Sequence, residues 1–361
     1  MLNIAIIVAV VLILAILIVI FRVSTLVGII KGDSKKHVPS SNKLQATLML
    51  SFLVLGLLAF FYYSFGGLDE EFVSPVASEH GEVTERLFWI TMGITGTVFI
   101  ITQIFLFGFA FRYQHKEDRK AYFYPHNNKL ELFWTGVPAI VLALLILSGW
   151  KAWVDITGKA PDDSEVIEVM GYQYAWMVRY PGSDNKLGSY DYKKIDAVNQ
   201  MGIDFSDKAA FDDFVPRELH VPKGKPVLLK IRARDVIHSV YSTHFRLQMN
   251  AVPGMPTRFW FVPTKTTAEM RLETGNEDFN YELICNKICG KGHFAMKYII
   301  VVDEPDEYEE WYKSQDPWLK MNSDYLSQVP EDLEEAAKIA AGLENKEEIQ
   351  AVGGVSISSS K

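Results

Sequence analysis

The stretch Cys285-Asn-Lys-Ile-Cys289-Gly-Lys-Gly-His293-Phe-Ala-Met296 decides the fold of the carboxyl-terminal half of the chain. It holds both cysteines of the 361 residues, together with a histidine and a methionine. A further imidazole lies upstream, at His238 in the run "RDVIHSV". Thiolate, thioether and imidazole are soft ligands that favour copper over magnesium, calcium or manganese. The residues and their spacing therefore predict a copper site.

Three alternative roles for the two cysteines compete with a dinuclear copper site. A disulfide is common in oxidising compartments, but it leaves the histidines and the methionine without a role. A structural zinc site usually spaces its cysteines as C-x2-C, and methionine is a poor zinc ligand. A mononuclear blue-copper site needs one thiolate, so one cysteine would be in excess. Two thiolates that bridge two copper ions account for the whole set, and we prefer this interpretation.

Short strand-like runs separated by turns surround the cysteine loop. Residues 165–180 are rich in aromatic and β-branched side chains, and a Lys-Gly-Lys-Pro turn divides the run 218–240. Further runs follow at 257–273, 279–285 and 297–305. This spacing predicts an all-β Greek-key sandwich or small barrel. Residues 181–215 are polar and are expected to form a long insertion loop.

The amino-terminal part contains four apolar windows that are long enough to cross a bilayer, at about 2–21, 46–65, 87–111 and 132–150. The first lacks the basic start and the cleavage site of a signal peptide, so we expect it to be retained. The first and third connecting loops are basic, whereas the second holds six acidic residues and one arginine. Because basic loops stay in the cytoplasm, the amino terminus and everything after residue 150 are expected outside it.

The chain divides into four parts by composition: two leading helices (1–66), a helical hairpin (67–152), an external β domain (153–302) and an acidic, helix-prone tail (303–361). The formal net charge is −8 overall and −10 in the tail alone. This distribution excludes a single soluble domain, and the missing basic face argues against a nucleic-acid partner. Two cysteines and no C-x-x-C-H motif exclude a disulfide scaffold and covalently attached haem.

Taken together, these features resemble subunit II of the haem–copper cytochrome c oxidases. The resemblance covers residues from about 125 to 302 and rests on "LELFWTGVPAIVLALLIL", "GYQYAW", "DVIHS", "NAVPG" and the cysteine loop. It implies a membrane-anchored all-β architecture with a cupredoxin-like domain that holds the dinuclear copper centre CuA. In that centre the two sulfurs bridge the coppers, each histidine caps one copper, and the thioether and a backbone carbonyl are axial ligands. The implied ligands are His238, Cys285, Lys287 (backbone carbonyl), Cys289, His293 and Met296.

The resemblance also implies the place of the chain in an enzyme. As a subunit of a proton-translocating oxidoreductase in the bacterial inner membrane, the chain would accept electrons from a c-type cytochrome. It would pass them to haem in subunit I, where oxygen is reduced. The copper domain and the amino terminus would be periplasmic, and lipid would surround the helices. The helices of 1–66 are additional to the usual hairpin, and we expect them to contact neighbouring subunits.

Several positions depart from the family pattern or allow a second interpretation. Lys287 and Asn250 replace two carboxylates, which makes an interfacial magnesium doubtful, and we expect the Lys287 ammonium to take its place. In the family, electrons arrive at an aromatic motif with two tryptophans. Here Tyr174 replaces the first tryptophan and Trp176 is the second. We expect electrons to enter there; alternatively, both side chains only pack the domain. Glu131, at the start of the fourth window, is expected on a proton path or, alternatively, as a helix-start acid.

Alternative functions are less consistent with these residues. Quinol oxidases lack the copper ligands, and nitrous oxide reductase needs more than the eight histidines present here. A membrane-anchored copper chaperone or sensor gives no role to Glu131 and "GYQYAW". The acidic tail either helps to dock a basic cytochrome or is only solvated, and a donor held permanently in a larger assembly would need no steering. His220 and His244 match no ligand position and are expected to be structural or solvated.

Overall fold

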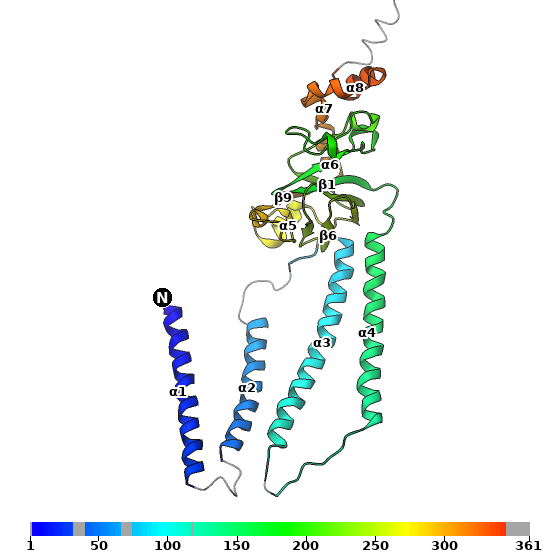
Figure 1. Ribbon diagram of the computed structural model, residues 1–361. Helices are drawn as coiled ribbons and strands as arrows, with labels where there is room; N and C mark the ends of the chain where they lie inside the picture. Colours follow the sequence, from blue (N-terminus) through cyan, green and yellow to red (C-terminus); the bar gives the residue numbers. More distant parts are fainter. Residues whose placement is uncertain (1, 32–39, 66–73, 117, 344–361) are drawn as a thin grey trace, which may run out of the picture. The chain divides into compact units, whose positions relative to one another are not determined.

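The computed structural model describes residues 2–31, 40–65, 74–116 and 118–343. They belong to two compact units, one formed by 1–72 and 90–141 and the other by 73–89 and 142–361. Four long helices come first in the chain (Figure 1): α1 (Leu2–Ile30), α2 (Ser40–Phe65), α3 (Glu79–Arg112) and α4 (Asn128–Thr157). As the sequence predicts, all four are long and apolar enough to cross a membrane.

Both α3 and α4 extend beyond the apolar windows because polar groups complete their ends. At the start of α3, Ser78 Oγ accepts a hydrogen bond from the Gly81 amide at 3.0 Å, as an N-cap does. A Cβ at Gly81 would lie 2.7 Å from that oxygen, so this turn needs glycine. At the end of α4, Trp260 Nε1 donates to the Asp155 carbonyl at 2.7 Å. This bond satisfies one of the carbonyls that a helix leaves free at its carboxyl end.

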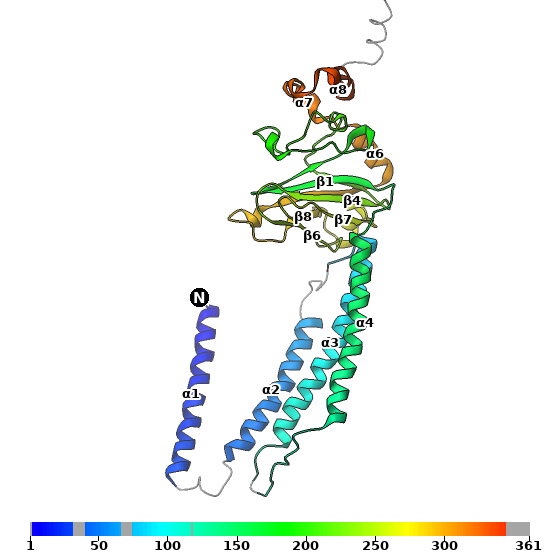
Figure 2. The ribbon, with the colours of Figure 1, turned by 45° about the vertical axis from the view of Figure 1, so that its right-hand side comes forward.

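The second unit contains two sheets that form the predicted sandwich (Figure 2). The first has the order β2-β1-β4-β7 and the second the order β3-β9-β8-β5-β6. Strand β1 pairs with β4, and β3 with β9, in parallel; the other pairings of named strands are antiparallel. The strands are β1 (Glu165–Tyr172), β2 (Ala175–Arg179), β3 (Leu219–Pro222), β4 (Val227–Ala233), β5 (His238–Ser242), β6 (Leu247–Ala251), β7 (Thr257–Phe261), β8 (Tyr281–Cys285) and β9 (Lys297–Asp303).

The hydrophobic core lies between the two sheets. Alternate residues of the strands point inward, so Ile167 and Val169 of β1 face the same core as Val240 of β5 and Leu283 of β8. Cys285, Cys289 and Met296 belong to this core as well. The cysteine loop is therefore anchored in the packed interior of the sandwich.

The run 257–273, expected to contain strand structure, is only partly a strand. Residues 257–261 form β7, but Thr267–Thr274 form helix α5. Thr266 and Glu269 make a capping box, in which each side chain accepts a hydrogen bond from the backbone amide of the other. This local signal starts a helix where the β-branched residues alone suggest a strand.

The insertion 181–215 and the tail pack together in a second hydrophobic cluster. The insertion has only short 3-10 helices, η2 (Gly182–Asp184), η3 (Tyr192–Lys194) and η4 (Lys208–Ala210), yet Ile203, Phe205 and Phe211 are fully buried. The tail supplies Trp318, whose ring stacks on Phe205 with centroids 5.4 Å apart. The tail elements are α6 (Pro305–Lys313), α7 (Trp318–Met321), η6 (Ser323–Gln328), η7 (Glu331–Leu333) and α8 (Glu334–Ala340). As far as residue 343, the tail is thus part of the folded unit.

Candidate metal centre

Two neighbouring strands and the loop between β8 and β9 bring the candidate ligands together. His238 is the first residue of β5, and Cys285 is the last residue of β8. These strands are antiparallel, with Val240 opposite Cys285, so His238 lies beside the start of the cysteine loop. The Asn286 amide then donates to the Ser239 carbonyl at 3.0 Å, which ties the loop to β5. The short 3-10 helix η5 (His293–Ala295) turns the chain back toward β9.

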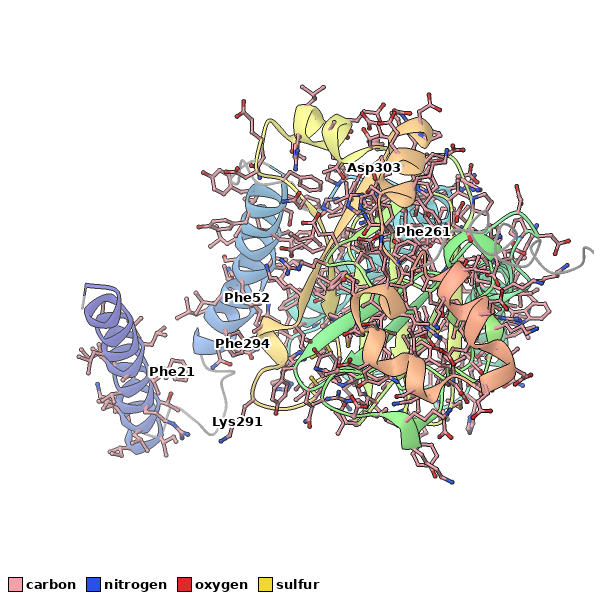
Figure 3. The ribbon with its side chains drawn as sticks, turned by 90° about the horizontal axis from the view of Figure 1, so that it is seen from above. Phe21, Phe52, Phe261, Lys291, Phe294 and Asp303 are labelled. Carbon is pink, nitrogen blue, oxygen red and sulfur yellow. The ribbon has the colours of Figure 1, made fainter. Side chains whose placement is uncertain are left out.

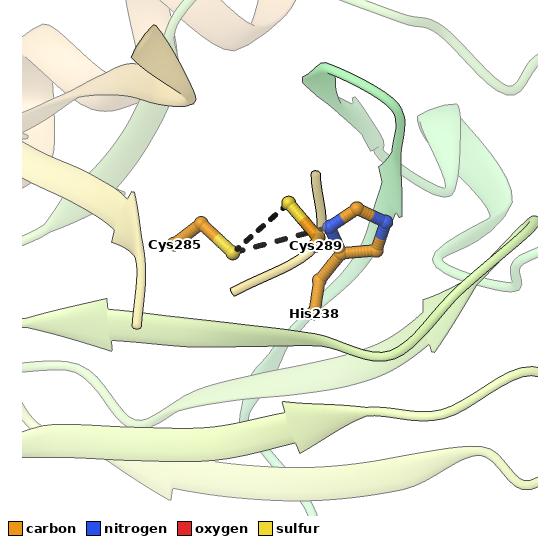
Figure 4. Close-up of side chains that lie close together, drawn as sticks. All are labelled: His238, Cys285 and Cys289. Atoms are coloured by element: carbon orange, nitrogen blue, oxygen red, sulfur yellow. Dashed lines mark hydrogen bonds between the residues drawn. The ribbon is translucent and has the colours of Figure 1, made fainter. Parts of the chain in front are cut away.

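The soft donor atoms converge within this loop (Figure 4). The ligand atoms of His238, Cys285 and Cys289 all lie within 4.8 Å of one another. Cys285 Sγ is 3.9 Å from His238 Nδ1 and 3.2 Å from the Lys287 carbonyl oxygen. Cys289 Sγ is 3.7 Å from His293 Nδ1 and 3.4 Å from Met296 Sδ. Each sulfur therefore has its own imidazole, and the thioether and the carbonyl lie at different sulfurs.

The two cysteines are free thiols. Their Sγ atoms are 4.0 Å apart, about twice the length of a disulfide bond of roughly 2.05 Å. The loop thus separates the sulfurs while keeping both directed into one site. This arrangement suits two thiolates that share metal ions between them.

Most of the site is shielded from solvent, and only His293 among its side-chain ligands is partly exposed. His238 is completely buried, Met296 is 1% exposed, and the two cysteines are 7–8% exposed. Burial, together with the neighbouring Cys285 thiol, raises the pKa of Cys289 to about 11. The metal-free thiol is therefore protonated at neutral pH, and a metal that binds it must displace a proton.

Asp235 fixes the orientation of the His238 ring, a role that was not expected from the sequence. Its Oδ1 lies 2.9 Å from His238 Nε2, and its Oδ2 accepts from the Gln173 backbone amide at 2.7 Å. Burial opposes ionisation, but hydrogen bonds from the Gln173 amide and the His238 ring outweigh it and lower the pKa of Asp235. Because a carboxylate can only accept a hydrogen bond, the His238 Nε2 carries the ring proton. The lone pair of His238 Nδ1 then faces Cys285. The D-x-x-H spacing at 235–238 is the signal that could have revealed this.

The two aromatic residues predicted at the site occupy different environments. Trp176 is 3% exposed, and its ring centroid lies 5.9 Å from that of His238. Tyr174 is 40% exposed, and its hydroxyl accepts a hydrogen bond from the Lys291 amide at 3.2 Å. A Cβ at Gly290 would lie 2.4 Å from the Tyr174 hydroxyl, so glycine permits this close approach. Tyr174 therefore lies at the surface, against the loop that carries His293.

The other predicted positions lie outside the donor cluster. The side chains of Lys287 and Asn250 are exposed. His220 bonds Asp303 through Nδ1 at 2.7 Å, and His244 Nδ1 donates to the Pro75 carbonyl at 2.9 Å. These contacts agree with a structural role for both histidines.

Glu131 has a local partner at the start of α4. Its Oε1 accepts from the Asn127 amide at 3.3 Å, and the Asn127 side chain accepts in turn from the Leu130 amide at 3.1 Å. These bonds support the helix-start interpretation of Glu131. The proton path stays a prediction, and unchanged proton uptake by a Glu131→Gln oxidase would contradict it.

Comparisons with known proteins point to one family. The family model "Cytochrome C oxidase subunit II, transmembrane domain" matches residues 69–151. The alternative cytochrome c oxidase subunit 2 of Bradyrhizobium diazoefficiens is 33% identical over 244 residues, which cover 67% of this chain and 83% of the relative. Cytochrome c oxidase subunit 2 of Thermostichus vulcanus is 28% identical over 315 residues, covering 72% of this chain and 82% of that one. Among solved structures, the periplasmic domain of subunit II of cytochrome oxidase from Bradyrhizobium japonicum is 23% identical, with a TM-score of 0.30, over 43% of this chain and 96% of its own.

Proposed function

Because this chain belongs to the cytochrome c oxidase subunit II family and is the electron-accepting subunit of the oxidase, we propose that it accepts electrons at a dinuclear copper centre. The observation that carries the proposal is the convergence of two free thiols, two imidazoles, a thioether and a carbonyl on one largely buried site. The proposed ligands are His238, Cys285, Lys287 (backbone carbonyl), Cys289, His293 and Met296.

The donor set fits this cofactor better than a single metal ion. Soft sulfur and imidazole ligands select copper, and a single blue-copper ion would use one thiolate. Cys285 and Cys289 would hold the two coppers, which would supply one-electron transfer with little rearrangement. The chain's own residues hold the ligands in place, since Asp235 orients one imidazole and the packed core excludes water.

We expect Asp235→Asn to lower the affinity of the chain for copper by roughly 10- to 100-fold, the usual effect of losing a partner that orients a ligand. The amide removes the charge that favours the bound tautomer of His238. Copper titration of the full-length chain measures the change. Asp278→Asn, at an exposed position of the same domain, is the matched control and should bind copper like the parent. Equal affinities in all three proteins would contradict the role of Asp235.

We further propose that Tyr174 and Trp176 receive the electron from the donor. The support is the exposure of Tyr174 and its contact with the loop that carries His293, with Trp176 buried beside His238. In the purified oxidase, Tyr174→Ala should slow electron arrival from a c-type cytochrome by at least about tenfold, since the gap to the donor widens. Tyr174→Phe keeps the ring and should stay close to the parent. If the alanine variant matches the parent in stopped-flow reduction, the aromatic pair only packs the domain.

Lys287 is proposed to replace the interfacial magnesium ion of the family. Its ammonium group is exposed on the cysteine loop, where it can supply positive charge to a neighbouring subunit. We expect metal analysis of the purified oxidase to find no magnesium at this interface, and Lys287→Glu to restore magnesium binding. Stoichiometric magnesium in the parent would refute the substitution.

The proposed setting is the bacterial inner membrane, with the copper domain and the amino terminus on the periplasmic side. The basic, acidic, basic order of the connecting loops supports this orientation. The proposed partners are oxidase subunit I, which holds the accepting haem, other oxidase subunits, membrane lipid and a c-type cytochrome donor. Labelling of single cysteines introduced into the loops of a variant without Cys285 and Cys289 tests the orientation, because only external sites should react with an impermeant reagent.

A copper chaperone or sensor is the alternative that the site supports less well. Proteins that exchange copper need ligands that a partner can reach. Here His238 and Met296 are buried and the loop is anchored between two strands. The shielding instead favours a centre that keeps its metal and transfers only electrons.

A further inference from the structure

Three loops meet around Tyr174 at the surface next to the candidate metal centre. Tyr174 lies in the turn between β1 and β2, and the backbone of that turn is bonded to Asp235 through the Gln173 amide. On another side, the Gln173 side chain donates to the Cys289 carbonyl at 2.6 Å. The turn, the segment before β5 and the cysteine loop therefore form one continuous surface.

The charged residues of these loops are mostly cationic. Lys291 is exposed, whereas Lys287 is already assigned to a neighbouring subunit. Arg234 is half-buried, donates to the Gln200 side chain at 3.3 Å and lies over the Tyr172 ring, with its guanidinium carbon 4.4 Å from the centroid. The structure describes every residue of these loops, and Asp235 is their one carboxylate. Its two oxygens already accept hydrogen bonds from the His238 ring and the Gln173 amide. A docking partner would therefore meet a net positive charge on these loops.

Large apolar side chains project from the same surface. Ile288 is 87% exposed and Phe294 is 84% exposed, and Figure 3 shows Phe294 near Lys291 at the edge of the domain. Exposed apolar groups bordered by charge are typical of sites where proteins dock. Tyrosine is enriched at the most important positions of interfaces, and the Tyr174 hydroxyl contacts the same loop at the Lys291 amide. We call this set the donor-facing surface: Tyr174, Ile288, Lys291 and Phe294.

We propose that the donor-facing surface docks a c-type cytochrome whose haem edge is surrounded by carboxylates, not by lysines. The proposal rests on the proposed function, because it names the partner of that site. Opposite charges across a docking surface accelerate encounter and set its orientation, while like charges repel. The apolar centre, with Phe294 and Ile288, would then exclude water next to Tyr174.

The experiment uses the complete oxidase and two forms of one soluble cytochrome c, the lysine-rich protein and the same protein with its lysines succinylated. Succinylation reverses the sign of the charge and keeps the haem. The variants are Lys291→Gln, which removes one charge, and Lys291→Glu, which reverses it. Lys208→Glu makes the same reversal at an exposed position of the insertion and serves as the control.

With the succinylated donor at low ionic strength, we expect the second-order rate constant to fall roughly threefold for Lys291→Gln and roughly tenfold for Lys291→Glu. The lysine-rich donor should show increases in the same order, and both effects should fade as salt screens the charges. If Lys291→Glu slows the lysine-rich donor, or if it resembles Lys208→Glu with both donors, the inference is wrong. The copper content of the same preparations tests the proposed function separately. If the parent chain holds fewer than two coppers, the proposed function fails; if it holds two, the kinetic result bears on the docking surface alone.

Discussion

Replacing Cys289 by serine is expected to reduce the copper bound by the chain from two ions to at most one and to slow electron transfer through the oxidase by more than about 100-fold. The Cys289 sulfur lies 3.7 Å from His293 Nδ1 and 3.4 Å from Met296 Sδ. A serine hydroxyl is a hard ligand that does not replace a bridging thiolate on copper. The loss should therefore exceed the 10- to 100-fold effect of removing a partner that only orients a ligand.

The serine variant should still fold, because serine differs from cysteine by one atom and the core around it is otherwise intact. Near-ultraviolet circular dichroism of the metal-free chain should match that of the parent. Copper analysis and single-turnover reduction kinetics of the complex then report the site alone. Two copper ions per chain in Cys289→Ser would show that this sulfur is not a bridge.

The second large effect is expected at Arg179, which joins the insertion to the sandwich. Its side chain is 1% exposed. The guanidinium pairs with Glu168 at 2.8 Å and with Asp213 at 2.8 Å, and it also donates to the Gly188 carbonyl at 2.9 Å. Glu168 has a second partner in Arg232, at 2.7 Å. Arg179→Met would therefore leave Asp213 as a buried carboxyl group without its cationic partner.

At pH 9, where Asp213 is ionised, we expect Arg179→Met to destabilise the β domain by about 3–5 kcal/mol, the usual cost of breaking a buried ion pair on one side. Thermal unfolding of the full-length chain should shift downward by about 6–20 °C. Burial raises the pKa of Asp213 to about 8 even beside Arg179, and losing the cation raises it further. Since an acid with a raised folded-state pKa costs stability as pH rises toward that pKa, the gap between variant and parent should widen above about pH 8.

Arg217→Met is the matched control for this measurement, because Arg217 is exposed near the same segment. Its unfolding free energy should change by no more than about 0.5 kcal/mol. Similar melting temperatures for Arg179→Met and Arg217→Met would contradict the view that buried ion pairs hold the insertion on the sheet.

The sequence was sufficient to predict the helices and the donor cluster. Four apolar windows longer than the bilayer core have few alternatives, and the structure places a helix at each. The candidate ligands were predictable because four of the side chains lie within one short loop, between Cys285 and Met296. A short loop keeps its residues close together in any fold, and only His238 had to be brought in by strand pairing.

The packing of the insertion was not predictable from local pattern. Met201, Ile203 and Phe205 are buried at the spacing of a strand, yet this segment belongs to neither sheet. Their partner Trp318 lies far along the chain, in a tail whose composition is typical of an acidic, solvated segment. Asp213 adds a second link, since its carbonyl accepts from the Trp318 amide at 2.7 Å. Long-range contacts of this kind leave no signal in the spacing of either segment.

The most direct test of the account is copper analysis and electron paramagnetic resonance of the full-length chain, purified without the other subunits and loaded with copper. A centre with two bridging thiolates predicts two copper ions per chain and a spectrum in which one unpaired electron couples equally to two copper nuclei. Saturation at a single copper, with coupling to one nucleus, would contradict the dinuclear centre and the function built on it.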